Sequence, residues 1–488
     1  MAEIFIGIDF GAVNLKCVRA DKKLRGIRLG GEYSTPNAIL YNKMQSGDVD
    51  KIIGTTALTQ GEMHNPENLI VGIKRKLEEK NWRRKIPALN REITAPEVAE
   101  DIFKKIYECV ANNFSPEDKF HAAVTVPVIF TEHQRQLLKD SAGRAGFEVD
   151  AVINESFAAL FATPPQDNSL SVIFDFGGST LDVSVIKVEG EEISELAAGG
   201  LRIGGLDIDR AILEKILRPK FAAEIDAAWN FENAVDFQLN FARKIKEALY
   251  AADADDFVEG WLIEFHPGFE KIKIARAEID ALLDGEDYSE KIIALLDEVF
   301  EELSQGADCF DKSDVTNIYA LGGTMNIPHF RNLLEKYFER EISGDLEIED
   351  KNLAVAGGAA NFLQLREKIK TANAIPYRVC YSIGENLNLG IAKNMPSGFE
   401  TLYMNLDLTA LNNFGWKIEL YQTFSDVVNF ENAAYLGEVQ LNSELYEKVE
   451  PPLLRLKILR DGRIKLTMSE RRIAGSDAEI VLVEEFVI

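Results

Sequence analysis

Residues 8–14 of this 488-residue chain read IDFGAVN, and residues 174–180 read FDFGGST. Each motif lies between two apolar runs, which predicts a strand, a tight glycine turn and a returning strand. An ionised carboxylate inside a buried strand is costly unless it is paired, so Asp9 and Asp175 need a partner. Glycine turns let backbone N–H groups converge on an anion, and an aspartate beside them can hold a hydrated Mg²⁺. Two such turns facing each other would grip a polyphosphate; two unrelated hairpins are the alternative, and the repetition argues against it.

The composition is that of a globular protein. Hydrophobic residues make up 46% of the chain and charged residues 27%, and this length allows about two to four domains. The net charge of −26 argues against a nucleic-acid partner, because phosphate backbones are bound by basic surfaces. No apolar run approaches the length that spans a bilayer, so we expect no membrane partner.

The four cysteines lie far apart: Cys17, Cys109, Cys309 and Cys380. Without a Cys-x-x-Cys pair they favour neither a zinc site nor a disulfide framework. The first residues carry no basic group, and the apolar stretch that follows stops at Asp9, which is typical of a buried strand rather than a targeting segment. We therefore expect a soluble, cytoplasmic protein with no metal site beyond Mg²⁺ brought in by a nucleotide.

Strand and helix patterns alternate up to about residue 370, which predicts an α/β fold. Strands are predicted at 120–127, 149–153 and 318–324. Helices are predicted at 67–80, 94–112, 131–146, 156–162, 208–217, 232–252, 287–303, 329–338 and 353–367. Thr94 is a candidate cap of the second helix, and Thr131 with Gln134 has capping-box spacing at the start of the third.

Several turns in this pattern are suited to a ligand. Asn154-Glu155 ends the strand 149–153, where open α/β sheets place their ligands. Gly322-Gly323 precedes a helix whose N-terminus suits a phosphate or a sugar. On the predicted helix 67–80, Lys74-Arg75-Lys76 forms a basic face, which is either a solvated surface or places Lys74 near a γ-phosphate.

These motifs together resemble the nucleotide-binding half of the DnaK-like, seventy-kilodalton heat-shock chaperones, within the actin and sugar-kinase superfamily. The resemblance rests on 8–11 as the first phosphate loop, Val126-Pro127 with Gln134-Arg135-Gln136 as a proline-arginine relay, Asn154-Glu155 as the catalytic glutamate, 175–182 as the second phosphate loop, Gly204-Gly205-Leu206-Asp207, and Leu321-Gly322-Gly323-Thr324 with Ile327-Pro328. Lys74 falls where the family keeps its phosphate-binding lysine.

The resemblance implies an actin-like, two-lobed ATPase domain over residues 1–370, with lobe I at about 1–168 plus 351–370 and lobe II at about 169–350. It implies ATP or ADP with Mg²⁺ as cofactors, and Asp9 and Asp182 as the residues that hold waters on the metal. The implied catalytic residues are Lys74, which neutralises charge on the γ-phosphate, Glu155 and Asp175, which position the attacking water, and Thr180. The implied nucleotide contacts are Gly11, Ala12, Val13, Asn14, Gly177, Gly178, Ser179, Gly204, Gly205, Lys246, Tyr250, Gly322, Gly323 and Asn326.

The chain departs from the family pattern at both ends of the nucleotide. Ala12 and Val13 stand where such chaperones usually carry two threonines, and losing one oriented hydrogen bond to a charged group costs roughly 1.5 to 3 kcal/mol. We therefore expect slow hydrolysis. Around Lys246, Arg243, Glu247 and Tyr250 replace the usual residues, and Asn326 stands where an arginine is common. ATP is still the expected nucleotide, with its base held differently.

After residue 371 strand alternation replaces helical periodicity, which predicts a β-sandwich over 377–488 after a linker at 371–376. Strands are predicted at 377–383, 387–391, 402–408, 416–424, 436–441 and 454–469, the last a hairpin about Arg460-Asp461-Gly462. The order resembles the peptide-binding β-domain of the same chaperones. The linker lacks the family's acidic-then-leucine run, and no helical lid precedes Ile488, so the resemblance implies a divergent, lidless member unless the natural chain continues.

Two classes of function follow from the sequence. The first is an ATP-dependent chaperone, a weak ATPase that binds unfolded or extended peptide clients through the β-domain and works with co-chaperones or a nucleotide exchange factor. The second is a nucleotide-sensing scaffold with little turnover that docks one folded partner. Ala12, Val13 and the linker favour the scaffold, whereas Glu155, Asp175 and Thr180 favour turnover. An actin-like filament former is a third, weaker alternative.

Overall fold

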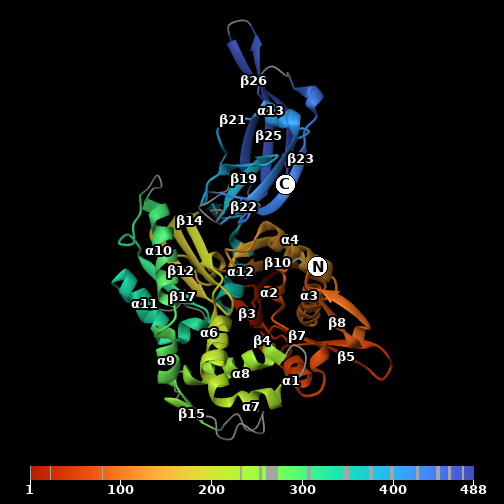
Figure 1. The fold of residues 1–488 in the computed structure, drawn as a ribbon, viewed down its shortest axis with the longest axis vertical. Helices are drawn as coiled ribbons and strands as arrows, with labels where there is room; N and C mark the ends of the chain where they lie inside the picture. The colour runs from red at the N-terminus through yellow and green to blue at the C-terminus, as the bar shows by residue number, and fades with distance from the viewer. Residues whose placement is uncertain are drawn as a thin grey trace.

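The computed structural model describes residues 2–488 except 22, 80, 231–233, 252–254, 260–272, 305–308, 344–350, 373–376, 396–399, 425–427, 447–450, 460–462 and 475–476. The chain folds as two α/β lobes followed by a β-rich domain, which stands at one end of the molecule (Figure 1). Within the described residues, no helix is both long enough and apolar enough to cross a membrane.

The first lobe is built on a six-stranded sheet in the order β11-β10-β1-β2-β3, with β4 also paired to β2. Its strands are β1 (Glu3–Phe10), β2 (Asn14–Ala20), β3 (Leu24–Ile27), β4 (Ser34–Pro36), β10 (Lys119–Val126) and β11 (Glu148–Asn154). The helices α3 (Ala95–Ala111) and α4 (Glu132–Ala145) belong to this lobe, and their apolar side chains share a core with β1 and β10. The capping box predicted at Thr131 and Gln134 is confirmed.

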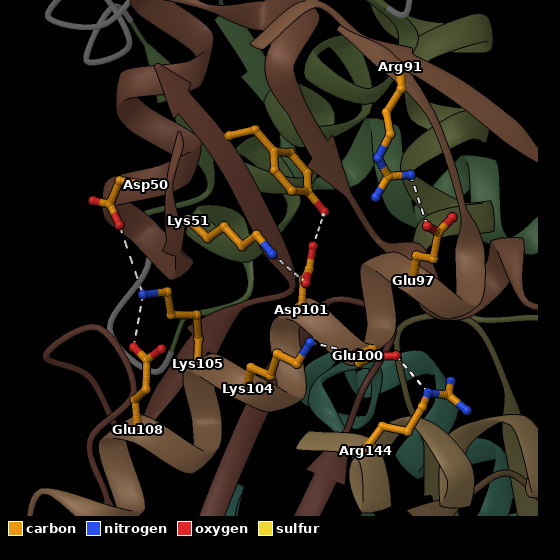
Figure 2. Close-up of polar contacts among 11 residues, drawn as sticks. Asp50, Lys51, Arg91, Glu97, Glu100, Asp101, Lys104, Lys105, Glu108 and Arg144 are labelled. Carbon is orange, nitrogen blue, oxygen red and sulfur yellow. Dashed lines mark hydrogen bonds and ion pairs between the residues drawn. The ribbon is translucent and has the colours of Figure 1, made fainter. Parts of the chain in front are cut away.

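Figure 2 shows charged side chains of α3 paired with one another and with neighbouring elements. The buried carboxylate of Asp101 accepts hydrogen bonds from the Tyr41 hydroxyl at 3.1 Å and from the Lys51 ammonium at 2.6 Å. Glu100 pairs with both Lys104 and Arg144, which ties α3 to α4. These contacts fix α3 against the sheet of β5 (Ala38–Lys43), β6 (Val49–Ile53) and β7 (Leu69–Val71) and against α4.

The second lobe repeats the pairing of the first around a five-stranded sheet in the order β17-β12-β13-β14-β18. The strands are β12 (Ser169–Phe176), β13 (Leu181–Glu189), β14 (Glu192–Leu201), β17 (Asn317–Leu321) and β18 (Lys370–Ala372). β1 runs parallel to β10 and antiparallel to β2, and β12 likewise runs parallel to β17 and antiparallel to β13. All eight residues of β12 are buried, as expected of a central strand covered on both faces.

The helices and short strands of this second half complete the lobe. They are α6 (Gly205–Ile212), a π-helical turn (Leu213–Leu217), α7 (Arg218–Ala228), α8 (Ala234–Leu249), α9 (Arg276–Asp284), α10 (Tyr288–Ser304) and α11 (Pro328–Phe338), with the strand pair β15 (Phe257–Glu259) and β16 (Lys273–Ala275). The helices predicted in this region are therefore confirmed, within a few residues at their ends.

Helix α12 (Ala354–Leu365) packs on the first lobe through close backbone contacts. A Cβ on Gly7 of β1 would lie 1.9 Å from the Ala356 carbonyl oxygen, and a Cβ on Gly358 would lie 1.9 Å from the Ala158 carbonyl oxygen. Only glycine fits at these two crossings. The hydrophobic cluster around α12 contains side chains of both sheets, including Ala123 and Ile173, so the lobes share one core at this point.

The β-rich domain consists of two four-stranded sheets around a common core. One sheet has the order β20 (Asn386–Ile391), β19 (Arg378–Ile383), β22 (Lys417–Thr423), β23 (Ala434–Gln440); the other has β21 (Met404–Asn405), β24 (Leu453–Ile458), β25 (Ile464–Ala474), β26 (Asp477–Val487). The predicted β-sandwich is therefore confirmed. The turn at Arg460-Asp461-Gly462 lies outside the described residues, but Ile458 and Ile464 pair across it as a hairpin requires.

Two element predictions are wrong. The helix 67–80 is interrupted: residues 69–71 form β7 and pair with β5, Gly72 has a φ of +66°, and only α2 (Ile73–Lys76) is helical. The strand 402–408 is reduced to β21, because the Asp407 side chain caps the short helix α13 (Leu408–Asn413). The 373–376 part of the predicted linker lies outside the described residues, and β18 pairs with β14 of the second sheet.

Candidate functional site

The two glycine turns face each other across a cavity of about 250 Å³ between the lobes. Most of the predicted site residues line it: Asp9, Gly11, Ala12, Val13, Asn14, Lys74, Glu155, Asp175, Gly177, Gly178, Ser179, Thr180, Gly205, Lys246, Gly322, Gly323 and Asn326. Three do not. Gly204 supports the second turn from behind, since a Cβ there would lie 2.5 Å from the Gly178 carbonyl. Asp182 is fully buried, and the Tyr250 hydroxyl bonds Asp280 at 2.6 Å.

Two lysine–carboxylate pairs lie on the first-lobe side of the cavity. Lys74, whose side chain is 3% exposed, pairs with Glu155. The basic triplet is therefore not one solvated face, because Lys74 points inward from α2 while Arg75 bonds Asp207 at 3.1 Å. Lys16 of β2 pairs with Asp9 of β1 at 2.8 Å. The arrangement brings fixed positive and negative charges to one wall of the cavity.

The second turn contributes carboxylates without a cation of its own. Burial, together with the charges of Glu155 and Asp9, raises the pKa of Asp175 to about 7. Burial also raises the pKa of Asp182 well above its usual range, and Glu155 and Asp175 add to that shift. One Asp182 oxygen accepts the Val128 N–H at 2.6 Å, while the other, Oδ2, is buried and accepts no hydrogen bond within the described residues. Burial thus disfavours the charged form of these two carboxyls, and an arriving cation would favour it.

These carboxylates suit a hydrated divalent ion. Hard cations such as Mg²⁺ take oxygen ligands and usually keep several waters in nucleotide sites. Within the described residues no group of three or more metal-ligating side chains is found. Asp9, Glu155 and Asp175 line the cavity, so a hydrated divalent ion there would meet carboxylate oxygens through its waters.

Side chains of the second lobe hold the second turn in place from below. The Lys246 ammonium donates to the Gly205 carbonyl at 2.8 Å and pairs with Asp209 at 2.6 Å. The Thr324 hydroxyl donates to the Gly177 carbonyl at 2.9 Å. The backbone itself closes the turn, since Gly177 N–H donates to the Thr180 carbonyl at 2.9 Å. Lys246 thus supports the loop as well as lining the cavity.

The predicted relay residues lie directly behind Glu155. The Arg135 guanidinium of α4 donates to the Asn154 side-chain oxygen at 2.7 Å and reaches the Pro127 carbonyl at 3.4 Å. The Asn154 amide in turn donates to the buried Glu195 at 3.3 Å, and the Ser184 hydroxyl donates to the same carboxylate at 2.6 Å. Burial raises the pKa of Glu195 to about 7. A hydrogen-bonded chain therefore joins α4 to the second sheet.

Sequence reasoning missed four residues of this site: Lys16, Asp209, Thr324 and Glu195. Lys16 had a usable signal, because a tight turn fixes the hairpin register and places it directly opposite Asp9. Asp209 had a weaker one, as a carboxylate on α6 shortly after the glycine-rich loop. Thr324 belongs to the motif Leu321-Gly322-Gly323-Thr324 described above, but its contact with the Gly177 carbonyl joins elements distant in sequence. The same holds for the contact of Glu195 with Asn154, and no local pattern predicts these contacts.

The β-rich domain contacts both lobes and carries a second hollow. Lys393, after β20, pairs with Glu298 and Glu302 of α10, and the Asn394 side-chain oxygen accepts the Ala198 N–H at 3.2 Å. The Gln422 oxygen of β22 accepts the Glu132 N–H at 2.9 Å, at the start of α4. A hollow of about 470 Å³ lies away from these contacts, between the β19–β20 turn, α13 and residues 428–430.

Comparison with known proteins extends over the two lobes. A family model described as Hsp70 protein matches residues 5–370. The chain is similar to "Chaperone protein DnaK" of Thermoplasma volcanium, with 29% identity over 370 residues, 73% of this chain and 57% of that protein. It is also similar to "Chaperone protein dnaK3" of Synechococcus elongatus, with 27% identity over 384 residues, 73% of this chain and 49% of that protein. The chain spans about half the length of the curated relatives it matches.

Proposed function

Because the chain belongs to the Hsp70 family, we propose that it is an ATP-dependent molecular chaperone that binds and slowly hydrolyses Mg-ATP and binds peptide or protein clients through its β-rich domain. The observation that supports this most is the convergence of two glycine turns, two lysine–carboxylate pairs and the carboxylate Asp175 around one cavity. A polyphosphate with its metal has the complementary charges, because its phosphates can pair with the lysines and its metal with the carboxylates.

The residue roles in this proposal follow from charge and position. Lys74 would move from Glu155 to the γ-phosphate, and Glu155 with Asp175 would then orient a water for attack on phosphorus. Thr180 and the turn Gly177-Gly178 would contact the β- and γ-phosphates. Asp9 and Asp182 would hold the waters of the metal, which supplies charge neutralisation between phosphate oxygens when bound.

The nucleoside end of the cavity would be held by the second lobe. Lys246 and the Gly322-Gly323 turn line the cavity there, together with Asn326. Gly322 has a φ of +86°, and a Cβ on it would lie 2.2 Å from the Phe176 carbonyl oxygen, so position 322 requires glycine. The turn therefore presents backbone rather than side chain to a base or sugar.

The turnover that we propose is slow. The Ala12 and Val13 side chains offer no hydroxyl to the phosphates, and Val13 instead packs on Gly178, where a Cβ would lie 2.3 Å from the Val13 Cγ2. The same observation favours the second candidate function, a nucleotide-sensing scaffold that docks one folded partner and turns over little. Glu155 and Asp175 are both at the cavity, as turnover requires.

The hollow of the β-rich domain is the proposed client site. Tyr381, Ile383 and Leu406 provide its apolar floor, while Asn386, Asn388 and Asn429 offer amides to an extended backbone. Alternating apolar and hydrogen-bonding contacts are what an extended peptide requires. Co-chaperones or a nucleotide exchange factor are further proposed partners, and a cytoplasmic location stays a prediction.

Calorimetry with ATP and ADP in Mg²⁺ tests the first part of the proposal. The wild-type chain is expected to bind both nucleotides, and Asp182→Ala to weaken binding because it removes the carboxylate with the unpaired oxygen. Single-turnover ATP hydrolysis, with and without an unfolded peptide, separates the two candidates: turnover stimulated by peptide supports the chaperone, whereas nucleotide binding without turnover supports the scaffold. No nucleotide binding by the wild-type chain would end both.

A further inference from the structure

The two glycine turns have the same hairpin register but different charges across it. Asp9 of β1 lies directly opposite Lys16 of β2, and Asp175 of β12 lies directly opposite Asp182 of β13. The chain therefore has a lysine in the first hairpin at the position where the second hairpin has a carboxylate. The first pair is an ion pair with 2.8 Å between nitrogen and oxygen, and the second places two carboxylates on neighbouring strands.

Lys16 is placed to act on a ligand as well as on Asp9. It lines the cavity between the lobes, and its side chain is 20% exposed while that of Asp9 is 7% exposed. An ammonium group carries three N–H donors, and the bond to Asp9 uses one of them. Because Lys16 lines the same cavity as Lys74 and Asp175, its ammonium can donate to a ligand there.

From this asymmetry, and resting on the proposed nucleotide site, we infer that Lys16 is a built-in counter-ion for the nucleotide polyphosphate that takes over part of the charge neutralisation otherwise left to the divalent metal. A divalent metal would then be held through waters on the side of the second hairpin, whose Asp175 lines the cavity. Asp9 is already paired with Lys16, so it contributes less to the metal than Asp175 does.

This arrangement makes nucleotide binding less dependent on metal. Without Mg²⁺, a polyphosphate entering a site lined only by carboxylates meets like charge, which opposes binding. Two ammonium groups, Lys16 and Lys74, counter that charge from the first lobe at a fixed position. A cation held by the protein needs no metal in solution, so chelation removes only part of the compensating charge.

A purely structural role is the competing explanation, in which the Lys16–Asp9 pair only stabilises its hairpin. The chain offers a matched control for it. Lys51 pairs with Asp101 at 2.6 Å, is partly buried like Lys16, and lies on the side of α3 shown in Figure 2, where it does not line the cavity. Removing Lys51 therefore perturbs a comparable ion pair without touching the proposed ligand.

The test measures the dissociation constant of ATP by calorimetry, in Mg²⁺ and again in excess EDTA, for the wild type, Lys16→Gln, Lys16→Arg and the control Lys51→Gln. Glutamine keeps a donor for Asp9, so Lys16→Gln removes the charge with little loss of the hydrogen bond; thermal melts confirm that each variant folds. We expect the wild type and Lys51→Gln to lose at most about tenfold in affinity in EDTA, and Lys16→Gln to lose about a hundredfold or more. Lys16→Arg retains the wild-type ratio.

The outcomes separate this inference from the function on which it rests. If the wild type binds no ATP in either buffer, the proposed function fails. In the second outcome the wild type binds ATP, but the ratio of the affinity in Mg²⁺ to that in EDTA differs by less than about tenfold between Lys16→Gln and the wild type. The proposed function then stands, and the role of Lys16 is wrong. A ratio that changes equally in Lys51→Gln also overturns the role, because it assigns the effect to hairpin or lobe stability.

Discussion

Buried lysine–carboxylate pairs occur both in the cleft and where the β-rich domain meets the lobes. The two places differ in whether a ligand can replace the carboxylate as the partner of the lysine. In the cleft, Lys74 is 3% exposed and its partner Glu155 lines a cavity of about 250 Å³. At the domain contact, Lys393 is 6% exposed and lies between Glu298 and Glu302 of α10. A ligand can give the cleft lysine a new partner, whereas the contact lysine loses its partners only if the domains separate.

The difference predicts which region is adaptable. Pairs in the cleft hold charge ready for a ligand, and each pair costs desolvation that a ligand or cation can relieve. The pair at the contact acts as a latch, since it joins elements far apart in the sequence, from two separate domains. Breaking the latch should therefore have the largest structural effect, and changing single groups in the cleft smaller effects that depend on pH and nucleotide.

The largest effect is expected from reversing the charge of the latch. Lys393→Glu would place a third carboxylate beside Glu298 and Glu302, and breaking a buried pair costs roughly 3 to 5 kcal/mol. The β-rich domain should leave the lobes, which small-angle scattering would detect as a larger radius of gyration. Lys465→Glu, at the exposed pair with Glu485 of the same domain, is the control and should change little.

Restoring the pair with opposite signs sharpens this test. Glu298→Lys with Glu302→Lys in the Lys393→Glu background should return the compact form. If Lys393→Glu alone stays as compact as the wild type, the latch does not hold the domains together, and the distinction drawn between the two regions is wrong.

The next effect concerns Asp175 and depends on pH. Burial and the neighbouring Glu155 and Asp9 raise the pKa of Asp175 from an ordinary 3.8 to about 7, so the folded protein holds this proton more tightly than the unfolded chain. Stability without nucleotide therefore falls as pH rises from about 4 to about 7 and stays lower above it. Asp175→Asn removes this loss of stability at high pH. It should raise the free energy of unfolding at pH 8 by about 2 to 4 kcal/mol, with little gain at pH 4.

A carboxylate with the opposite shift is the matched control. Hydrogen bonds from Lys104 and Arg144 lower the pKa of Glu100, so its stabilising contribution is present above the ordinary pKa and is lost as pH falls through the lowered one. Glu100→Gln should therefore destabilise the protein at pH 8 while Asp175→Asn stabilises it. Denaturant unfolding at pH 4 and pH 8 measures both; the same sign for the two variants would contradict the assignment.

The sequence predicted the cleft better than the contact, for a physical reason. The cleft contains local motifs whose strand–turn–strand pattern fixes the geometry of Asp9, Gly11, Asp175 and Gly177. Each of these motifs is contiguous in the sequence, so reading the sequence locates the site. The Lys393 latch depends on the packing of two domains, and no local pattern encodes it. The wrong helix at 67–80 has the same origin, because the pairing of β7 with β5 overrides the helical spacing of its apolar residues.

A smaller effect is expected from returning hydroxyls to the first turn. Val13 and threonine have nearly the same shape, so Val13→Thr should keep the packing on Gly178, and with Ala12→Thr it would restore two donors to the phosphates. The gain in the single-turnover hydrolysis rate should be at most about a hundredfold, from roughly 1.5 to 3 kcal/mol.

Glu155→Ala in the threonine background is the control for that gain. It should remove the added rate if Glu155 positions the attacking water. An unchanged rate in the threonine variant, with Glu155→Ala equally without effect, would favour the scaffold over the chaperone.

The last and smallest effect lies between the two regions. Helix α4 starts at the contact, where the Glu132 N–H donates to Gln422, and its Arg135 reaches Asn154 beside Glu155. A connection is therefore present although the linker lacks the family's usual run.

Coupling requires two states that differ in these contacts, and it is typically worth about 1 to 3 kcal/mol. We expect the low end, less than about tenfold in peptide affinity between ATP and ADP, because the linker lacks the family's usual run. Peptide affinity and off-rate with each nucleotide measure it, in the wild type, Arg135→Ala and the exposed control Lys139→Ala on the same helix. A change well above tenfold that Arg135→Ala abolishes and Lys139→Ala keeps would show that the relay couples the regions strongly, and that the latch and the cleft do not act independently.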